Sequence, residues 1–140
     1  MSDDKPFNKQ IAYMEDFDFE EDGSIKDKLL LYLNQYIPVV IMVQSGNCVH
    51  CQNAKPAFQD YANRTSRNEV ICATIDYLGS RNSQKQLVKR IEKVIPKAAT
   101  QGIPCYALFK NGVLVTSKEI KGRCVESLGQ FTGVKAKRKV

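Results

Sequence analysis

The feature that most constrains the fold is an unbroken apolar run at residues 39–43, Val39-Val40-Ile41-Met42-Val43. Pro38 precedes the run and the turn signal Ser45-Gly46-Asn47 follows it, so the run is bounded on both sides. Apolar side chains at every position, most of them β-branched, are typical of a strand covered on both faces, which parallel sheets require. The sequence therefore predicts a central strand with a layer of structure on each side.

Strand and helix patterns alternate along the rest of the chain. Ser24 can cap a helix that follows it, Pro56 lies inside a helical pattern that it is expected to kink, and Asn111-Gly112 supplies the positive φ angles of a tight hairpin. We expect strands at 9–19, 39–43, 70–75, 105–109 and 113–115, and helices at 25–35, 48–63, 83–95 and 124–131. The order β-α-β-α-β-α-β-β-α predicts an α/β fold with a central mixed sheet, in which parallel strands are followed by an antiparallel C-terminal hairpin.

The length of the chain and the distribution of its charges limit the domain organisation that it can have. The chain has 140 residues, the ordinary size of one domain, and we assign residues 1–134 to that domain, with 1–8 flexible. Residues 135–140 form a basic tail. No aromatic side chain is interleaved with its bases, so a frayed terminus is a better interpretation than a nucleic-acid site. No apolar stretch is long enough to cross a membrane and no secretory signal opens the sequence, so we expect a cytoplasmic monomer.

The segment Cys48-Val49-His50-Cys51 stands where the central strand gives way to a helix. A helix start offers unpaired N–H groups and a partial positive charge, which stabilise a thiolate. Cys51 returns to the same side of the helix, so it can close a disulfide with Cys48 or resolve a mixed disulfide. We therefore expect Cys48 to be the nucleophile and Cys51 the resolving thiol. His50 is the single histidine of the chain, and an imidazolium beside the pair would favour the thiolate and make the disulfide a better oxidant.

Other uses of the cysteine pair need to be weighed. A Cys-x-x-Cys pair can be half of a zinc site, but the remaining cysteines are isolated from one another, so we expect no metal. An odd number of cysteines, five in all, argues against a disulfide-stapled secreted scaffold and favours intracellular redox or catalytic use. A merely structural pair is the remaining alternative, and the position, the spacing and the adjoining histidine favour a redox pair over it.

From about Lys9 to Gly133 the chain resembles the thioredoxin superfamily. The central strand leads into the cysteine pair, Pro56 falls eight residues after the first cysteine, and residues 70–76 resemble the third strand of the family. The segment Gln101-Gly102-Ile103-Pro104 and the hairpin around Phe109-Lys110-Asn111-Gly112 closely resemble the family's cis-proline strand and hairpin, and Gly122 matches the glycine before the last helix. This combination is far more specific than Cys-x-x-Cys by itself.

The resemblance implies a thiol–disulfide oxidoreductase that acts on protein substrates. It implies no cofactor beyond the redox-active Cys48–Cys51 disulfide, and it implies a reductant or oxidant partner that the sequence does not identify. It also implies that the Ile103–Pro104 peptide bond is cis and faces the cysteines. The backbone of Ile103 would then pair with an extended substrate peptide, and Gly102 would let the chain approach closely.

Several positions depart from the pattern of the family. Asn47 stands where an aromatic residue usually precedes the first cysteine, and Val49-His50 matches neither the Gly-Pro of reductive thioredoxins nor the Gly-His of protein disulfide isomerases. Met42 replaces a buried acid that helps to deprotonate the second cysteine, and Cys72 replaces a lysine that often faces this acid. The joint loss strands no buried charge, but it predicts a slow resolving step. It also keeps open the alternative of a non-catalytic thioredoxin-fold binding module.

The remaining cysteines have simpler interpretations. Cys105 directly follows Pro104, which makes it a candidate for an additional redox thiol, although a small buried residue on a strand is the preferred interpretation. We expect Cys72 to lie in the core and Cys124 to lie at or near the surface.

Overall fold

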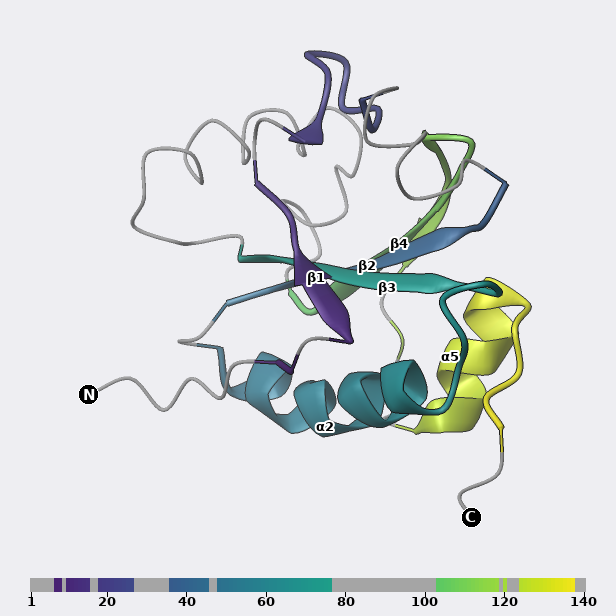
Figure 1. The fold of residues 1–140 in the computed structure, drawn as a ribbon. Helices are drawn as coiled ribbons and strands as arrows, with labels where there is room; N and C mark the ends of the chain where they lie inside the picture. Colours follow the sequence, from purple (N-terminus) through teal and green to yellow (C-terminus); the bar gives the residue numbers. More distant parts are fainter. Residues whose placement is uncertain are drawn as a thin grey trace.

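The computed structural model describes residues 7–8, 10–15, 18–26, 36–45, 48–76, 103–118, 120 and 124–137. The elements in this part of the chain are five strands and two helices (Figure 1). They are β1 (Ile11–Tyr13), β2 (Val39–Gln44), α2 (Val49–Asn63), β3 (Ile71–Asp76), β4 (Cys105–Lys110), β5 (Val113–Lys118) and α5 (Val125–Thr132). Neither of these two helices is long and apolar enough to cross a membrane.

The strands form one mixed sheet in the order β1-β3-β2-β4-β5. β2 pairs in parallel with β3 and antiparallel with β4, so it occupies the centre of the sheet. The hairpin between β4 and β5 turns at Asn111 and Gly112, whose φ angles are 54° and 79°. Both angles lie in the left-handed region, as an Asn-Gly turn requires. The predicted α/β fold with a mixed sheet and a C-terminal hairpin is confirmed.

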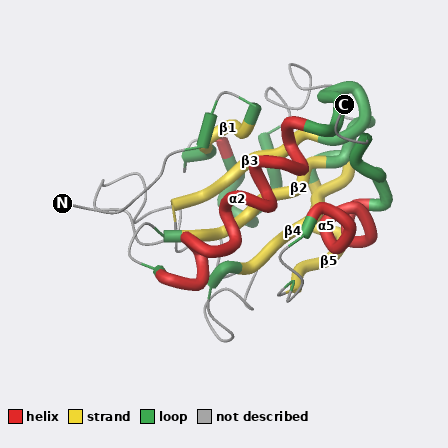
Figure 2. The backbone as a smooth tube through the Cα atoms, turned by 90° about the horizontal axis from the view of Figure 1, so that it is seen from below, coloured by secondary structure: helices red, strands yellow, loops and turns green. Residues whose placement is uncertain are grey.

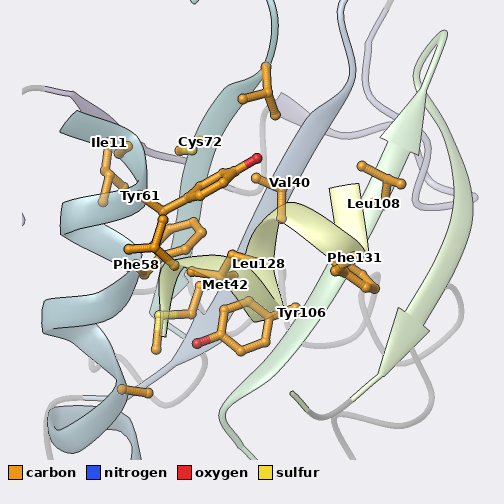
Figure 3. Packing of buried hydrophobic residues seen from close by; sticks show 14 residues of the cluster. Ile11, Val40, Met42, Phe58, Tyr61, Cys72, Tyr106, Leu108, Leu128 and Phe131 are labelled. Carbon is orange, nitrogen blue, oxygen red and sulfur yellow. The ribbon is translucent and has the colours of Figure 1, made fainter. Parts of the chain in front are cut away.

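Two apolar layers cover β2. Val39, Ile41 and Val43 belong to one buried cluster, which also contains Phe19 and Phe109. Side chains that alternate with them point to the other face of the sheet, where α2 and α5 lie together (Figures 1 and 2). The second cluster brings strand and helix side chains together (Figure 3), namely Val40 and Met42 of β2, Phe58 and Tyr61 of α2, Tyr106 of β4, and Leu128 and Phe131 of α5. The predicted two-sided burial of the central strand is confirmed.

The chain after α5 is held against the C-terminal end of α2. The Tyr61 hydroxyl donates to the carbonyl oxygen of Val134 at 2.6 Å and lies 2.6 Å from Thr132 Oγ1, and burial raises the pKa of this hydroxyl to about 12. Arg64 Nε donates to the carbonyl oxygen of Lys137, whose own N–H donates to Arg64 O, both at 2.7 Å. The expected frayed terminus is therefore wrong for residues 135–137, because backbone pairing with Arg64 holds them in place.

The N-terminal part of the chain also differs from expectation. The expected strand at 9–19 is reduced to β1, and Phe19 instead forms an isolated antiparallel bridge with Ile25. Ser24 does not cap a helix beginning at Ile25, because the Ser24 hydroxyl is bonded to Asp22 at 2.7 Å and the Ile25 N–H donates to Gly112 O. Most of the expected helix at 25–35 and the whole of the one at 83–95 lie outside the described residues. The other helices, expected at 48–63 and 124–131, are confirmed as α2 and α5.

Two glycines at the end of α5 give a matched test of backbone conformation. Gly133 ends the helix with a φ of 82°, and a Cβ added there would meet nothing within 4 Å. Gly129 lies inside the helix, where a Cβ would make an ordinary contact 3.5 Å from Val134 O. We expect Gly133→Ala to lower the free energy of unfolding by about 1 kcal/mol, since an L-residue is strained in that region. Gly129→Ala should raise it by up to about 1 kcal/mol, because alanine favours helix. Urea unfolding measures both, and equal losses would contradict the assignment of strain to Gly133.

Candidate active site

Cys48 occupies the N-cap of α2, directly after the end of β2. Its backbone is extended, with φ −102° and ψ 115°, and its half-buried Sγ accepts a hydrogen bond from the Cys51 N–H at 3.2 Å. An N-cap side chain in this geometry satisfies one of the N–H groups that a helix start leaves unpaired. A negatively charged sulfur would accept this bond more strongly than a neutral thiol. The helix start thus directs an N–H group at the Cys48 sulfur.

Cys51 lies deeper than Cys48, on the buried side of the first turn of α2. Its side chain is 0% exposed. Burial is the main cause that raises the pKa of Cys51, and the hydrogen bond with Cys48 adds to the rise, whereas a bond with the backbone of Ser45 and the charge of Lys55 lower it. The two sulfurs are therefore unequal, since one reaches the surface and the other is held protonated below it.

The chain before β4 lies beside the cysteines. The Ile103–Pro104 peptide bond is cis, as the family resemblance implies. The Cys48 thiol donates to the carbonyl oxygen of Ile103, with 3.6 Å between sulfur and oxygen. The structure therefore brings Cys48, Cys51 and Ile103 together, from segments far apart in the sequence. Gly102, the other residue expected here, lies outside the described residues.

The two residues between the cysteines face outward. His50 is exposed, and Val49 is exposed over 73% of its surface, a high value for an apolar side chain. Sequence reasoning did not single out Val49 as a surface feature. The exposure of Val49 could have been predicted, because the first turn of a helix after a buried strand has one side that the fold leaves uncovered.

The other three cysteines do not join the site. Cys105 is buried in the cluster on the sheet face opposite α2, which favours its interpretation as a small core residue. Cys72 is buried beneath α2, and burial raises its pKa to about 12. Cys124 is exposed at the N-cap of α5. All five cysteines are free thiols in this structure. Within the described ranges, no three histidine, cysteine, aspartate or glutamate residues are grouped so that they could hold a metal ion.

Two buried polar residues near the site were not anticipated. Gln44, the last residue of β2, donates from Nε2 to Thr74 Oγ1 at 3.3 Å, and that hydroxyl donates to Met42 O at 2.8 Å. Lys55 lies one helical turn after Cys51 and is only 4% exposed. Its signal in the sequence is a charged residue within the buried stripe of α2, four positions after Cys51 and three before Phe58.

The difference between the thiols predicts their reactivity with iodoacetamide. At pH 8 and under native conditions, we expect alkylation at Cys48 and at the exposed Cys124, which serves as the internal control. Cys51 and Cys72 should be protected until denaturant is added, because burial hinders access and raises their pKa values. Mass spectrometry of proteolytic peptides measures each site. Alkylation of Cys51 as fast as that of Cys48 would contradict this description of the pair.

Comparison with known proteins agrees with the fold. No family model matches the chain. The thioredoxin-like protein 453L of Invertebrate iridescent virus 6 is 29% identical over 133 residues, which cover 88% of this chain and 92% of that protein. The short form of thioredoxin f from spinach chloroplast matches with a TM-score of 0.57 and 16% identity, covering 92% of this chain and 96% of that one. The zinc-bound form of human ERp44 matches with a TM-score of 0.56 and 14% identity, covering 86% of this chain and 30% of that one. The fold is the thioredoxin fold, and the sequence is similar to that of a thioredoxin-like protein.

Proposed function

We propose that this protein is a thiol–disulfide oxidoreductase that exchanges disulfides with protein substrates through Cys48 and Cys51. The observation that carries the proposal is the unequal placement of the two sulfurs at the start of α2. Cys48 is half-buried and accepts the Cys51 N–H, whereas Cys51 is wholly buried and has a raised pKa. A reactive outer thiol backed by a protonated inner thiol is the arrangement that two-step disulfide exchange needs.

The exchange proceeds in two balanced steps. The Cys48 thiolate attacks one sulfur of a substrate disulfide, a mixed disulfide forms, and the other substrate sulfur leaves as a thiolate. Cys51 then loses its proton to solvent and attacks Cys48 Sγ, so that the bond to the substrate breaks and a Cys48–Cys51 disulfide forms. The substrate disulfide gains two electrons and the cysteine pair loses two. In the reverse direction the pair oxidises a substrate dithiol, and no cofactor is required.

An extended peptide is the substrate form that suits the surroundings of Cys48. The Ile103 carbonyl lies beside its sulfur, so a peptide that pairs with the backbone there would bring a disulfide to the nucleophile. The exposed Val49, next to Cys48 in the chain, offers such a peptide an apolar contact. The partner that returns the pair to its starting redox state would use the same surface.

Serine substitutions separate the roles of the two cysteines. We expect Cys48→Ser to abolish the reduction of insulin disulfides by dithiothreitol-coupled turnover, because the nucleophile is gone. Cys51→Ser should instead accumulate mixed disulfides with protein substrates, because the nucleophile remains and the resolving thiol is absent. Non-reducing electrophoresis and mass spectrometry detect the trapped species.

Cys124→Ser is the matched control for these variants, since Cys124 is an exposed cysteine outside the Cys-x-x-Cys pair. It should retain the activity of the unmodified protein. Full activity in Cys48→Ser would refute the assignment of the nucleophile. A native protein that neither reduces insulin nor traps substrates through Cys51→Ser would favour the non-catalytic binding module instead.

His50 is proposed to set the direction of electron flow, through its position between the cysteines. Its imidazolium would stabilise the reduced pair, which carries a thiolate, and not the uncharged disulfide. His50→Gln should therefore lower the reduction potential, by at most about 20 mV because the side chain is exposed. Equilibration with glutathione measures the potential of both forms. An unchanged or higher potential in the variant would remove the argument for an oxidising or isomerising role.

A further inference from the structure

Lys55 is the one charged side chain that is buried in the part of the chain the structure describes. A lysine is seldom buried, because removing its ammonium group from water is costly unless other groups compensate. Lys55 follows Cys51 by four residues on α2, so the two side chains share one face of the helix. Side chains on a helix lean toward its N-terminus, which directs the Lys55 stem back toward Cys51. The position and the burial of Lys55 therefore suggest that its positive charge acts on Cys51.

The N-terminal segment covers Lys55. Its Nζ lies 5.5 Å from the centroid of the Phe7 ring, and that ring packs edge-on against Phe58 at 5.8 Å. Asn8 holds the segment to α2, since its N–H donates to Gln59 Oε1 at 2.8 Å. An aromatic face attracts a cation and excludes water from it, so Phe7 compensates part of the cost of burial. The ammonium group is thereby kept in a medium of low dielectric constant, where its field is stronger than in water.

Among the described residues, the groups on the elements around Cys51 can be named one by one. On α2, the groups that act on it are Cys48, which raises its pKa, and Lys55, which lowers it. On the sheet face below α2, the β2 residues Met42 and Gln44 are neutral, and the β3 residues Cys72 and Thr74 are neutral when Cys72 is protonated. Asp76, at the end of β3 opposite Gln44, is the carboxylate on that face. Ile103 contributes a carbonyl group only.

We propose that Lys55 is a positioning residue for the resolving step, in which its buried ammonium group stabilises the Cys51 thiolate as that sulfur attacks Cys48. This inference rests on the proposed function. Cys51 releases its proton to solvent, its electron pair forms the bond to Cys48 Sγ, and the substrate sulfur leaves as a thiolate. Lys55 keeps its proton throughout. A cation on the same helix thus acts on Cys51 in a chain where Met42 replaces the buried acid of the family pattern.

The test measures the pKa of Cys51 directly. In a Cys48→Ala background, the thiolate of Cys51 is titrated by its ultraviolet absorbance and by its rate of alkylation. Lys55→Met keeps the apolar stem and removes the charge, and it should raise the pKa of Cys51 by about one pH unit. Lys55→Arg keeps the charge and should restore most of the original value. Asp76→Asn is the control for a nearby carboxylate, and it should not raise this pKa.

The same variants change the resolving step when Cys48 is present. A pKa higher by about one pH unit leaves about tenfold less thiolate at neutral pH, but each thiolate is about threefold more nucleophilic, so release of a preformed mixed disulfide should slow about threefold. Lys55→Arg should remove most of this slowing, which it would not do if the defect of Lys55→Met were merely structural. Phe7→Leu, which keeps the apolar cover and removes the ring, should raise the pKa of Cys51 in the same direction, and it replaces Lys55→Met if that variant does not fold.

Two outcomes separate the proposals. If the native protein exchanges no disulfides and Lys55→Met still raises the pKa of Cys51, the proposed function fails and the electrostatic role of Lys55 stands. If Lys55→Met and Phe7→Leu leave the pKa of Cys51 and the rate of release unchanged, the role of Lys55 is overturned whatever the activity of the protein.

Discussion

Because β2 is buried on both faces, its backbone groups have no access to water and must be paired within the protein. β3 on one side and β4 on the other supply that pairing along its length. The pairing also fixes where β2 ends, at Gln44, and the chain reaches the start of α2 within a few residues. Cys48 therefore has to serve as the N-cap of a helix whose lower face is committed to the sheet. The reactivity proposed for its sulfur follows from this packing, because the helix start that stabilises it cannot move away from the strand.

The two ends of α2 have different tasks. At the C-terminal end, the buried Tyr61 hydroxyl and two bonds of Arg64, one from its side chain and one to its backbone carbonyl, attach the helix to residues 134–137. At the N-terminal end, Val49 and His50 are exposed on the outer face of the first turn. A helix that is secured at one end can carry an uncovered, reactive first turn at the other without losing its place on the sheet. Pro56 lies between the two ends, and the kink expected there stays a prediction.

The parts of the fold that could be predicted from the sequence are those whose signals are local. The apolar run at 39–43 needs no partner to indicate a buried strand, and Asn111-Gly112 carries its own turn geometry. The failures depend on distant partners. Nothing near Ser24 indicates that the Ile25 N–H would bond to Gly112, and nothing near Lys137 indicates that Arg64 would hold it. The cysteine pair was predicted because its spacing is local too, whereas the proximity of Ile103 was available only through the family resemblance.

Lys55 shows how a departure from the pattern of a family can be read physically. A carboxylate beneath a buried thiol can accept its proton, but it also repels the thiolate that results. A buried cation has the opposite effects. It accepts no proton, but it attracts the thiolate once the proton has left. Met42 is a neutral residue of the core on the α2 side of the sheet, so it neither accepts a proton nor repels a thiolate. The compensation has to come from elsewhere, and Phe7 provides part of it from the N-terminal segment. The reactivity of the inner thiol is thus tied to a stretch of chain that contacts neither sulfur, because that stretch keeps water away from the charge that acts on it.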